Sequence, residues 1–268
     1  MIGFIGGGNM AEAIIKGMVQ SSRFKVQGSK KDIYVSEPQE ERSKYLEQTY
    51  GIKTVSDNKK VAENCSIVIF AVKPQDMDKV ISEVSGFISE DKTVISIAAG
   101  ITLSYLSARL KTRKIVRVMP NTPALVQEGM SVMSMCECIH DKDIGVIKDI
   151  FMSIGKVLVL PEKYMDAVTA LSGSGPAFFA YFIEAMIEGA VKMGLREDDA
   201  TALAIQTLLG TAKLLDTGLS PAKLREMVTS PGGTTAAGLK VFEERKFKEA
   251  VIAAIEAATN RANKLGRR

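Results

Sequence analysis

The chain of 268 residues has few cysteines and one histidine, the residue types on which disulfide frameworks and much acid–base catalysis depend. Cys65, Cys136 and Cys138 are an odd and sparse set, which does not suit a disulfide framework. We expect them to be small, buried apolar residues. His140 precedes Asp141 at the expected start of a helix and is expected to be exposed. A reaction that needs a strong general base is therefore disfavoured.

The same residues include the one spacing that suggests a metal. The sequence Cys136-x-Cys138-x-His140 would place three ligands on one face of a strand. Structural zinc normally takes four ligands, and the chain has no second cysteine pair to complete such a site. We therefore expect no metal site.

Long apolar runs and an excess of one charge are also missing. No apolar run approaches the roughly 18 to 20 residues that span a bilayer, and an apolar strand starting at residue 2 leaves no room for a signal peptide. Thirty-five basic and 31 acidic residues leave a net charge of +4, with no basic stripe interleaved with aromatics. These features predict a globular cytoplasmic protein that binds neither membrane nor nucleic acid.

Glycine, in contrast, is concentrated directly after the first expected strand. The opening apolar strand runs into Gly6-Gly7-Gly8-Asn9-Met10-Ala11, a G-x-G-x-x-A spacing followed by helical periodicity. Gly6 permits a tight turn, Gly8 lets a phosphate approach the backbone, and Ala11 allows close packing of helix on strand. Free N–H groups at the start of the helix, around Asn9 and Met10, would face a pyrophosphate. The alternative is a turn that only joins strand to helix.

Up to about residue 160, apolar strand-like runs alternate with helical patterns. This alternation is typical of βαβ units and predicts an α/β, Rossmann-type, mainly parallel sheet over residues 1–160. Further strands are expected at 33–35, 66–72, 93–98, 115–119, 131–135 and 156–160, and helices at 40–50, 77–88, 103–110 and 143–153.

After residue 160 the strand pattern ends, and residues 161–268 predict an all-helical second domain. Helices are expected at 165–171, 176–193, 197–215, 222–228, 235–244 and 248–265. The helix that starts at Pro176 is apolar around most of its circumference, and the last helix is rich in alanine. We infer that a partner subunit covers these faces. The alternative, burial at the centre of a single chain, suits a half of only about 100 residues less well.

The end of the second strand carries mixed signals about the cofactor. An acid there favours the free ribose 2′-OH of NADH, whereas a hydroxyl or cation accommodates the 2′-phosphate of NADPH. Ser36 and Arg42, with Lys30 and Lys31 before the strand, favour NADPH, and Glu37 favours NADH. We expect NADPH, with NADH as the alternative. A solvated loop of mixed charge would give the same pattern.

Three later strands end in residues suited to a dinucleotide, at the carboxyl edge where open α/β folds bind ligands. Ala71-Val72-Lys73-Pro74 offers a lysine and a rigid turn. Ala98-Ala99-Gly100 would let a flat nicotinamide lie close to the backbone. Asn121-Thr122-Pro123 offers an amide and a hydroxyl. Each could equally be a simple turn.

The sequence Ser230-Pro231-Gly232-Gly233-Thr234-Thr235, here called the 230–235 loop, lies between two expected helices. Its glycines can expose successive N–H groups while hydroxyls gather before the next helix, an arrangement that suits a carboxylate. A threonine that merely caps the helix is the alternative.

Together with Leu171-Ser172-Gly173-Ser174-Gly175-Pro176-Ala177, these motifs resemble those of the pyrroline-5-carboxylate reductase family over essentially the whole chain. The resemblance implies an NAD(P)H-dependent reduction of L-1-pyrroline-5-carboxylate to L-proline, the last step of proline biosynthesis. It also implies a helical dimerisation domain behind the Rossmann domain, and a homodimer that in some members builds a decamer.

The resemblance further implies roles for individual residues. The substrate carboxylate would lie on the backbone of Gly232 and Gly233, beside Ser230 and Thr234, and Ser174 would also contact the substrate. Thr235 would be the catalytic residue, hydrogen-bonded to the ring nitrogen. Because a cyclic imine is already electrophilic, hydride transfer needs placement more than a strong base. The residues expected to contact the cofactor are Gly6, Gly8, Asn9, Met10, Ser36, Asn58, Ala71, Val72, Lys73, Pro74, Ala98 and Asn121.

Two alternatives remain at this point. A β-hydroxyacid dehydrogenase shares the plan but uses a lysine of the helical half, for which Lys192, near the end of its helix, is the only candidate. A non-catalytic NAD(P)-binding regulatory protein would keep the glycine turn, but the intact 230–235 loop argues against it.

Overall fold

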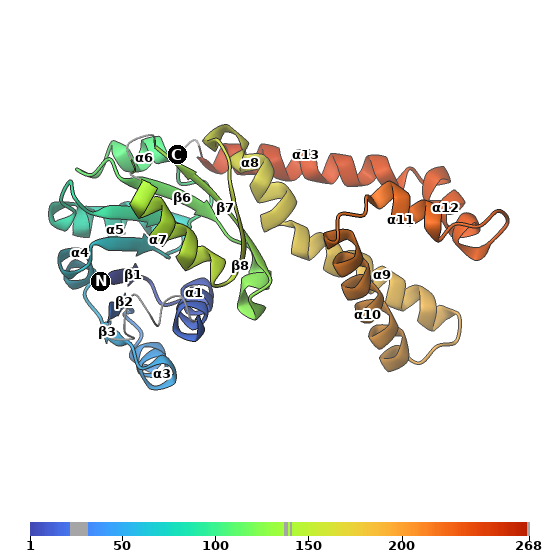
Figure 1. Cartoon of the computed structure of the whole chain (residues 1–268), viewed down its shortest axis with the longest axis horizontal. Coiled ribbons are helices and arrows are strands. Elements are labelled where there is room, and N and C mark those ends of the chain that lie inside the picture. Colours follow the sequence, from blue (N-terminus) through green and yellow to red (C-terminus); the bar gives the residue numbers. More distant parts are fainter. Residues whose placement is uncertain (22–31, 137–138, 140, 267–268) are drawn as a thin grey trace. The chain divides into compact units, whose positions relative to one another are not determined.

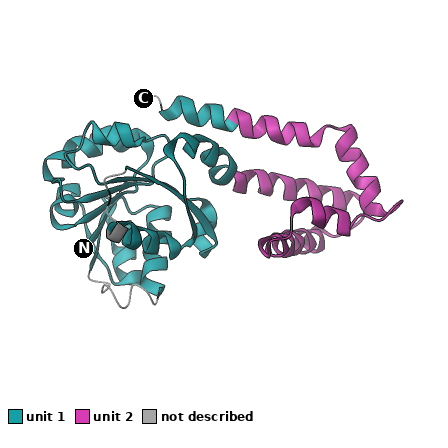
Figure 2. Ribbon diagram, turned by 45° about the horizontal axis from the view of Figure 1, so that its top comes forward, with its two compact units in different colours: residues 1–174, 258–268 teal, residues 175–257 magenta. Residues whose placement is uncertain are grey.

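A computed structural model describes residues 1–21, 32–136, 139 and 141–266. Lys30, Lys31, Cys138 and His140 therefore lie outside the described residues. The chain divides into two compact units, the first made of Met1–Ser174 with Ala258–Arg268 and the second of Gly175–Ala257 (Figure 2). The functional boundary expected between residues 160 and 161 stays a prediction, because compactness does not say which residues bind which molecule.

The first unit is built on one sheet of eight strands in the order β3-β2-β1-β4-β5-β6-β7-β8. All neighbours pair in parallel except β6 and β7, which are antiparallel. The predicted mainly parallel, Rossmann-type sheet is therefore confirmed. The strands are β1 (Ile2–Ile5), β2 (Ile33–Ser36), β3 (Lys53–Val55), β4 (Ile67–Phe70), β5 (Thr93–Ser96), β6 (Ile115–Met119), β7 (Gly129–Met135) and β8 (Gly155–Val159).

Helices cover both faces of this sheet (Figure 1). Because successive strand residues point to opposite faces, Phe4 packs into one apolar cluster and Ile5 into another. The first cluster is covered by α1 (Asn9–Gln20), α3 (Glu40–Tyr50) and α7 (Asp141–Met152), and the second by α4 (Asn58–Asn64), α5 (Met77–Val84) and α6 (Leu103–Ser107). Side chains on the two faces of β1 therefore pack against both helical layers.

Several elements differ from their expected bounds. The sequence did not predict β3 or α4, since β3 has three residues with no buried side chain and α4 buries only Val61 and Ala62. The segments expected at 66–72, 77–88 and 103–110 are longer than the observed β4, α5 and α6. Short 3-10 turns follow the strand or helix in two of these places, η2 (Pro74–Asp76) and η3 (Ser85–Phe87).

An ion cluster joins the sheet to the helices that end the first unit. The Arg117 side chain, on β6, is 5% exposed and its guanidinium lies 3.2 Å from Glu162 and 3.8 Å from Asp166. Glu162 belongs to the 3-10 turn η5 (Glu162–Tyr164) and Asp166 to α8 (Met165–Val168). Asn263, near the end of α13 (Phe247–Gly266), donates to Asp166 at 3.2 Å. The cluster therefore fixes three elements against β6.

The helix expected at 165–171 is interrupted. After α8 the backbone forms a π-helical turn, η6 (Thr169–Gly173), in which Ser174 N donates to Thr169 O at 2.9 Å. The next helix, α9 (Gly175–Lys192), follows directly, with Pro176 in its first turn as expected. Such π turns are frequent at functional sites.

The second unit is entirely helical, comprising α9, α10 (Glu197–Asp216), α11 (Pro221–Met227), α12 (Thr234–Glu244) and the first part of α13. Phe182, Phe242 and Phe247 form an aromatic cluster in this unit, with ring centroids 5.0 to 6.4 Å apart. Phe179 and Tyr181 on α9 are 60% and 76% exposed. The alternative that α9 is buried at the centre of a single chain is therefore wrong. No described helix is long and apolar enough to cross a membrane.

Candidate functional site

The glycine turn after β1 has the backbone form that a dinucleotide site needs. Gly6 has φ of 98°, and its N–H donates to Ser36 O at 2.9 Å. A Cβ at this position would lie 2.9 Å from Ala71 O. Residue 6 must therefore be glycine, because a side chain would meet both a left-handed backbone and a neighbouring carbonyl.

The first turn of α1 leaves its N–H groups without a side-chain partner. The N-cap is Gly8, which makes no side-chain cap hydrogen bond, and a Cβ at Gly8 would meet nothing within 4 Å. Ala11 is buried against the sheet. Uncapped N–H groups at an approachable helix start fit a pyrophosphate, and the residues present, among them Asn9 and Met10, would hold it through the backbone.

At the end of β2, two expected cofactor residues contact each other. The Ser36 side chain is fully buried, and its hydroxyl donates to Asn58 Oδ1 at 2.7 Å. Asn58 Nδ2 in turn donates to Glu83 Oε2 at 2.7 Å. The structure thus brings Ser36 and Asn58 together, with the Ser36 hydroxyl buried against the half-buried Asn58.

Glu37 follows that pair and faces the glycine turn. Its Oε2 accepts from Gly7 N at 3.0 Å, and its Oε1 accepts from Gln39 N at 2.9 Å. Two main-chain donors therefore fix the carboxylate beside the glycine turn.

Arg42, expected to favour NADPH, is bound by Gly7 and Glu12. Its Nε donates to Gly7 O at 2.7 Å and its second guanidinium nitrogen pairs with Glu12 at 2.5 Å. Glu12 also accepts hydrogen bonds from the hydroxyls of Tyr45 and Tyr50. Burial alone would raise the pKa of Glu12, but the hydrogen bonds from Tyr50, Arg42 and Tyr45 together bring it below its ordinary value.

Sequence reasoning missed Glu12. Its partners lie about 30 residues or more along the chain, so no local spacing reveals them, and only an acid in the first turn of a helix was visible.

The carboxyl ends of β4 and β5 keep the small residues that were expected there. Ala71 N donates to Ile5 O at 2.9 Å, and Pro74 begins η2 directly behind the exposed Lys73. Ala98 is buried. A Cβ on Gly100 would lie 3.2 Å from the main chain of Leu265, so this turn also accommodates the end of α13.

Asn121 links the end of β6 to the segment 171–177, which contains Ser172. Its Oδ1 accepts from Met130 N at 2.9 Å, and its Nδ2 donates to Ser172 Oγ at 3.2 Å. A Cβ on Gly173 would lie 2.7 Å from Met119 Cε, so the π turn packs closely on the strand end. The structure therefore places Ser174, the residue after this turn, close to the strand end that carries Asn121.

The 230–235 loop belongs to the second unit. Gly233 N donates to Ser230 O at 3.0 Å, and Gly232 has φ of 71°. The N-cap of α12 is Gly233, which has no side-chain cap hydrogen bond, and Thr234 and Thr235 are its first two helical residues. A threonine cap is therefore wrong, and the helix starts one residue earlier than expected. Its first N–H groups suit an anion.

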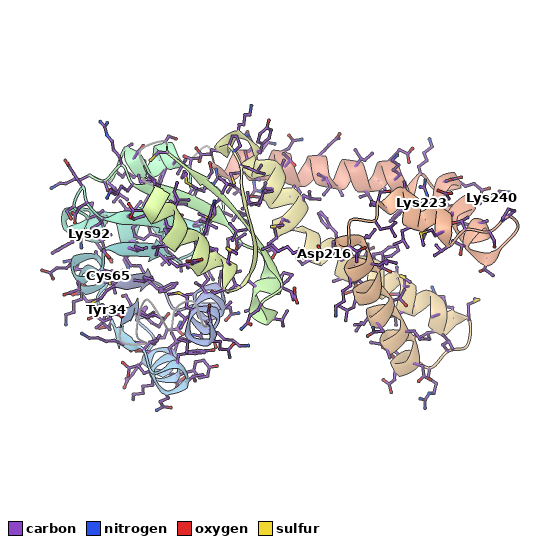
Figure 3. All side chains as sticks on the ribbon, viewed as in Figure 1. Tyr34, Cys65, Lys92, Asp216, Lys223 and Lys240 are labelled. Atoms are coloured by element: carbon purple, nitrogen blue, oxygen red, sulfur yellow. The ribbon has the colours of Figure 1, made fainter. Side chains whose placement is uncertain are left out.

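The cysteines take no part in a described metal cluster, since no group of three His, Cys, Asp or Glu side chains gathers among the described residues. Cys65 is 1% exposed, as expected, and burial raises the pKa of its thiol to about 11. Lys92 is labelled near Cys65 in Figure 3. Its Nζ donates to the carbonyls of Ala62, Glu63 and Cys65. Cys136 is half-buried and disulfide-bonded, so the expectation of a buried apolar residue is wrong there.

Comparisons with known proteins cover both units. Residues 162–265 match a family model described as pyrroline-5-carboxylate reductase dimerisation, and residues 1–100 match one described as NADP oxidoreductase, coenzyme F420-dependent. A pyrroline-5-carboxylate reductase of Synechocystis is 40% identical over 100% of this chain and 98% of its own. One of Escherichia coli is 39% identical over 99% of this chain and 98% of its own.

Solved structures give the same result. A pyrroline-5-carboxylate reductase of Coxiella burnetii superposes with a TM-score of 0.91 at 35% identity, covering 100% of this chain and 98% of that one. A Plasmodium falciparum pyrroline carboxylate reductase with NADP bound superposes with a TM-score of 0.87 at 32% identity, covering 99% of this chain and 97% of that one. The similarity thus runs through both units.

Proposed function

Because the chain belongs to the pyrroline-5-carboxylate reductase family, we propose that it reduces L-1-pyrroline-5-carboxylate to L-proline with a hydride from a nicotinamide dinucleotide. The family and the oxidoreductase class predicted from the motifs are confirmed. NADPH is the cofactor, with NADH as the alternative. The observation that carries the proposal is similarity over the full length, together with a glycine-lined, uncapped helix start in each unit.

The first unit supplies the cofactor residues. The N–H groups at the start of α1 would bind the pyrophosphate, with Gly6 and Gly8 keeping side chains away from it. Ala98 and Asn121 would lie against the nicotinamide, and Ala71, Val72, Lys73 and Pro74 would line the approach. When bound, the reduced nicotinamide supplies the hydride. Asn121 is suited to this position because both ends of its amide are already fixed.

The 230–235 loop supplies the substrate residues. The uncapped N–H groups around Gly233 and the hydroxyls of Ser230 and Thr234 would hold the carboxylate, while Ser174 would contact the ring. Thr235 would donate a hydrogen bond to the ring nitrogen as the imine carbon accepts the hydride. Such positioning does not need a histidine, which agrees with the scarcity of that residue.

The chain forms a homo-oligomer, in keeping with the dimerisation model that its helical half matches. At the finer level, we propose a homodimer in which a second copy covers the exposed apolar face of α9, and a decamer as the larger assembly of such dimers. We also place the enzyme in the cytoplasm, in amino-acid biosynthesis.

A cofactor oxidation assay tests the function. The protein is mixed with NADPH or NADH, with and without pyrroline-5-carboxylate, and loss of the reduced nicotinamide is followed with proline as the product. Oxidation only in the presence of the imine is expected. Turnover with 3-hydroxy acids and NAD(P)⁺ instead would favour the β-hydroxyacid dehydrogenase, whose candidate Lys192 is the last residue of α9. Cofactor binding without any turnover would favour the regulatory protein.

A further inference from the structure

Glu37 lies where a Rossmann fold contacts the adenosine ribose of its cofactor. It comes directly after Ser36, the last residue of β2, and this is the place at which such folds distinguish a free 2′-hydroxyl from a 2′-phosphate. Its carboxylate is anchored by Gly7 N and Gln39 N. A Cβ on Gly7 would lie 3.0 Å from Glu37 Oε2, so the carboxylate rests on the phosphate-binding turn itself.

The anchoring matters because each carboxylate oxygen retains a second lone pair. Those lone pairs can accept from the hydroxyls of a ribose that follows a pyrophosphate at the start of α1. A 2′-phosphate in the same place would bring like charges together. The two amides prevent the carboxylate from turning away to relieve that repulsion.

Two groups that could counter the repulsion, the Ser36 hydroxyl and the Arg42 guanidinium, are already engaged. The Ser36 hydroxyl is buried and donates to Asn58. Arg42 is bound to Gly7 O and paired with Glu12, whose carboxylate offsets its positive charge. The lowered pKa of Glu12 keeps that partner ionised. The contacts thus distinguish between residues whose types favour different cofactors. Ser36 and Arg42 are engaged by other protein groups, whereas the Glu37 carboxylate can still accept from a ribose.

We propose that Glu37 is the specificity-determining residue of the cofactor site, accepting hydrogen bonds from the adenosine ribose of NADH and weakening the binding of the 2′-phosphate of NADPH. The enzyme therefore uses NADH more readily than its relationship to NADP-binding proteins would suggest. The inference rests on the proposed function only in requiring a nicotinamide dinucleotide.

The test measures binding by isothermal titration calorimetry, without turnover. Dissociation constants of NAD⁺, NADP⁺, ADP and 2′,5′-ADP are determined for the wild type, Glu37→Gln and Glu37→Ser. We expect both variants to raise the affinity for NADP⁺ relative to NAD⁺ by roughly 10- to 100-fold, the range that removal of one like charge gives. The fragments should follow the same order, since they differ only in the 2′-phosphate.

The matched control is Glu40→Gln, which removes the same charge from an exposed carboxylate that pairs with Lys44 on α3. Its ratio of NADP⁺ to NAD⁺ affinity should stay within a factor of about two. An unchanged ratio in the Glu37 variants, or an equal shift in the control, would overturn the proposal.

The assay with pyrroline-5-carboxylate separates the two failures. If the binding ratio shifts but no imine is reduced, the proposed function fails and the role of Glu37 stands. If the imine is reduced and the ratio does not shift, the function stands and the role of Glu37 fails. The same shift should appear in kcat/KM for NADPH relative to NADH.

Discussion

Single polar residues stabilise this protein by bonding to several groups at once, and Glu12 is the clearest example. One carboxylate accepts from a guanidinium and two phenols, and it thereby joins α1 to α3. Because these donors lower the pKa of Glu12 in the folded state, unfolding takes up a proton when the solution is acidic. The stability that Glu12 contributes is complete above the ordinary glutamate pKa and is lost as the pH falls through its lowered folded-state pKa.

Glu12→Gln should therefore destabilise the protein by about 1 to 2 kcal/mol near pH 7, because a neutral amide loses the ion pair and cannot satisfy all three donors. In acid, at a pH below the ordinary glutamate pKa, the difference should shrink as the wild-type carboxylate takes up a proton. Urea unfolding at both pH values measures this. Glu40→Gln, at an exposed i,i+4 pair, should change stability by only a few tenths of a kcal/mol. Equal effects of the two substitutions would contradict the role of the cluster.

Thr235 is the residue on which the proposed chemistry depends most. Thr235→Ala should lower kcat by roughly 10- to 1,000-fold, the range for a lost hydrogen bond to a reacting group. The fold should survive, because Thr235 is the second residue of α12 and alanine favours helix. Thr235→Ser, which keeps the hydroxyl, should recover much of the rate. Steady-state kinetics with both cofactors measures this, and normal turnover of the alanine variant would remove Thr235 from the mechanism.

Among the elements, the pairing of β7 with β8 leaves no room for a side chain at Gly155. Gly155 has φ of 139°, and a Cβ there would lie 1.9 Å from Gly129 O on the neighbouring strand. Neither the conformation nor the space admits a side chain. The edge strand β8 therefore depends on a glycine at this position of its pairing with β7.

Gly155→Ala should destabilise the protein by about 3 kcal/mol or more, since backbone must move to admit the methyl group. Gly145→Ala is the control, because a Cβ there meets nothing within 4 Å and the residue lies within α7, where alanine is favoured. Midpoints of urea unfolding compare the two. A similar midpoint for Gly155→Ala and the wild type would show that β8 can shift without cost.

Elements were predicted well where the pattern is local and long. The strand β6 and the helices α3 and α10 have their expected bounds to within one residue, because periodicity within each segment marks them. The short β3 was missed because its three residues have no buried side chain to mark a face. The π turn at Thr169–Gly173 was missed because its bond from Ser174 N to Thr169 O has no sequence signature of its own.

At the scale of the whole molecule, the helical unit exposes more apolar surface than a monomer usually does. Tyr181 is 76% and Phe179 60% exposed, on a helix that the sequence makes apolar around most of its circumference. A large exposed apolar face of this kind marks an interaction site. The occupant that we propose for this face is a second copy of the chain.

Tyr181→Glu should shift the protein towards smaller species, because a charge would have to be buried at the interface. Analytical ultracentrifugation over a range of concentrations measures the change. Gln48→Glu adds the same charge to an exposed position on α3 and should leave the assembly intact. If the tyrosine variant sediments as the wild type does, another surface must form the interface.

The sequence by itself determined the parallel sheet, the helical second half, the glycine turn and the 230–235 loop. Each of these depends on residues close together in the chain, whose types and spacing predict the local backbone conformation. Only the tertiary structure decided that Arg42 pairs with Glu12, that Ser36 turns inward to Asn58, and that Glu37 is left beside the glycine turn. Those contacts join residues about 20 to 30 positions apart, and a polar side chain with several possible partners selects one only when the fold brings it within hydrogen-bonding distance.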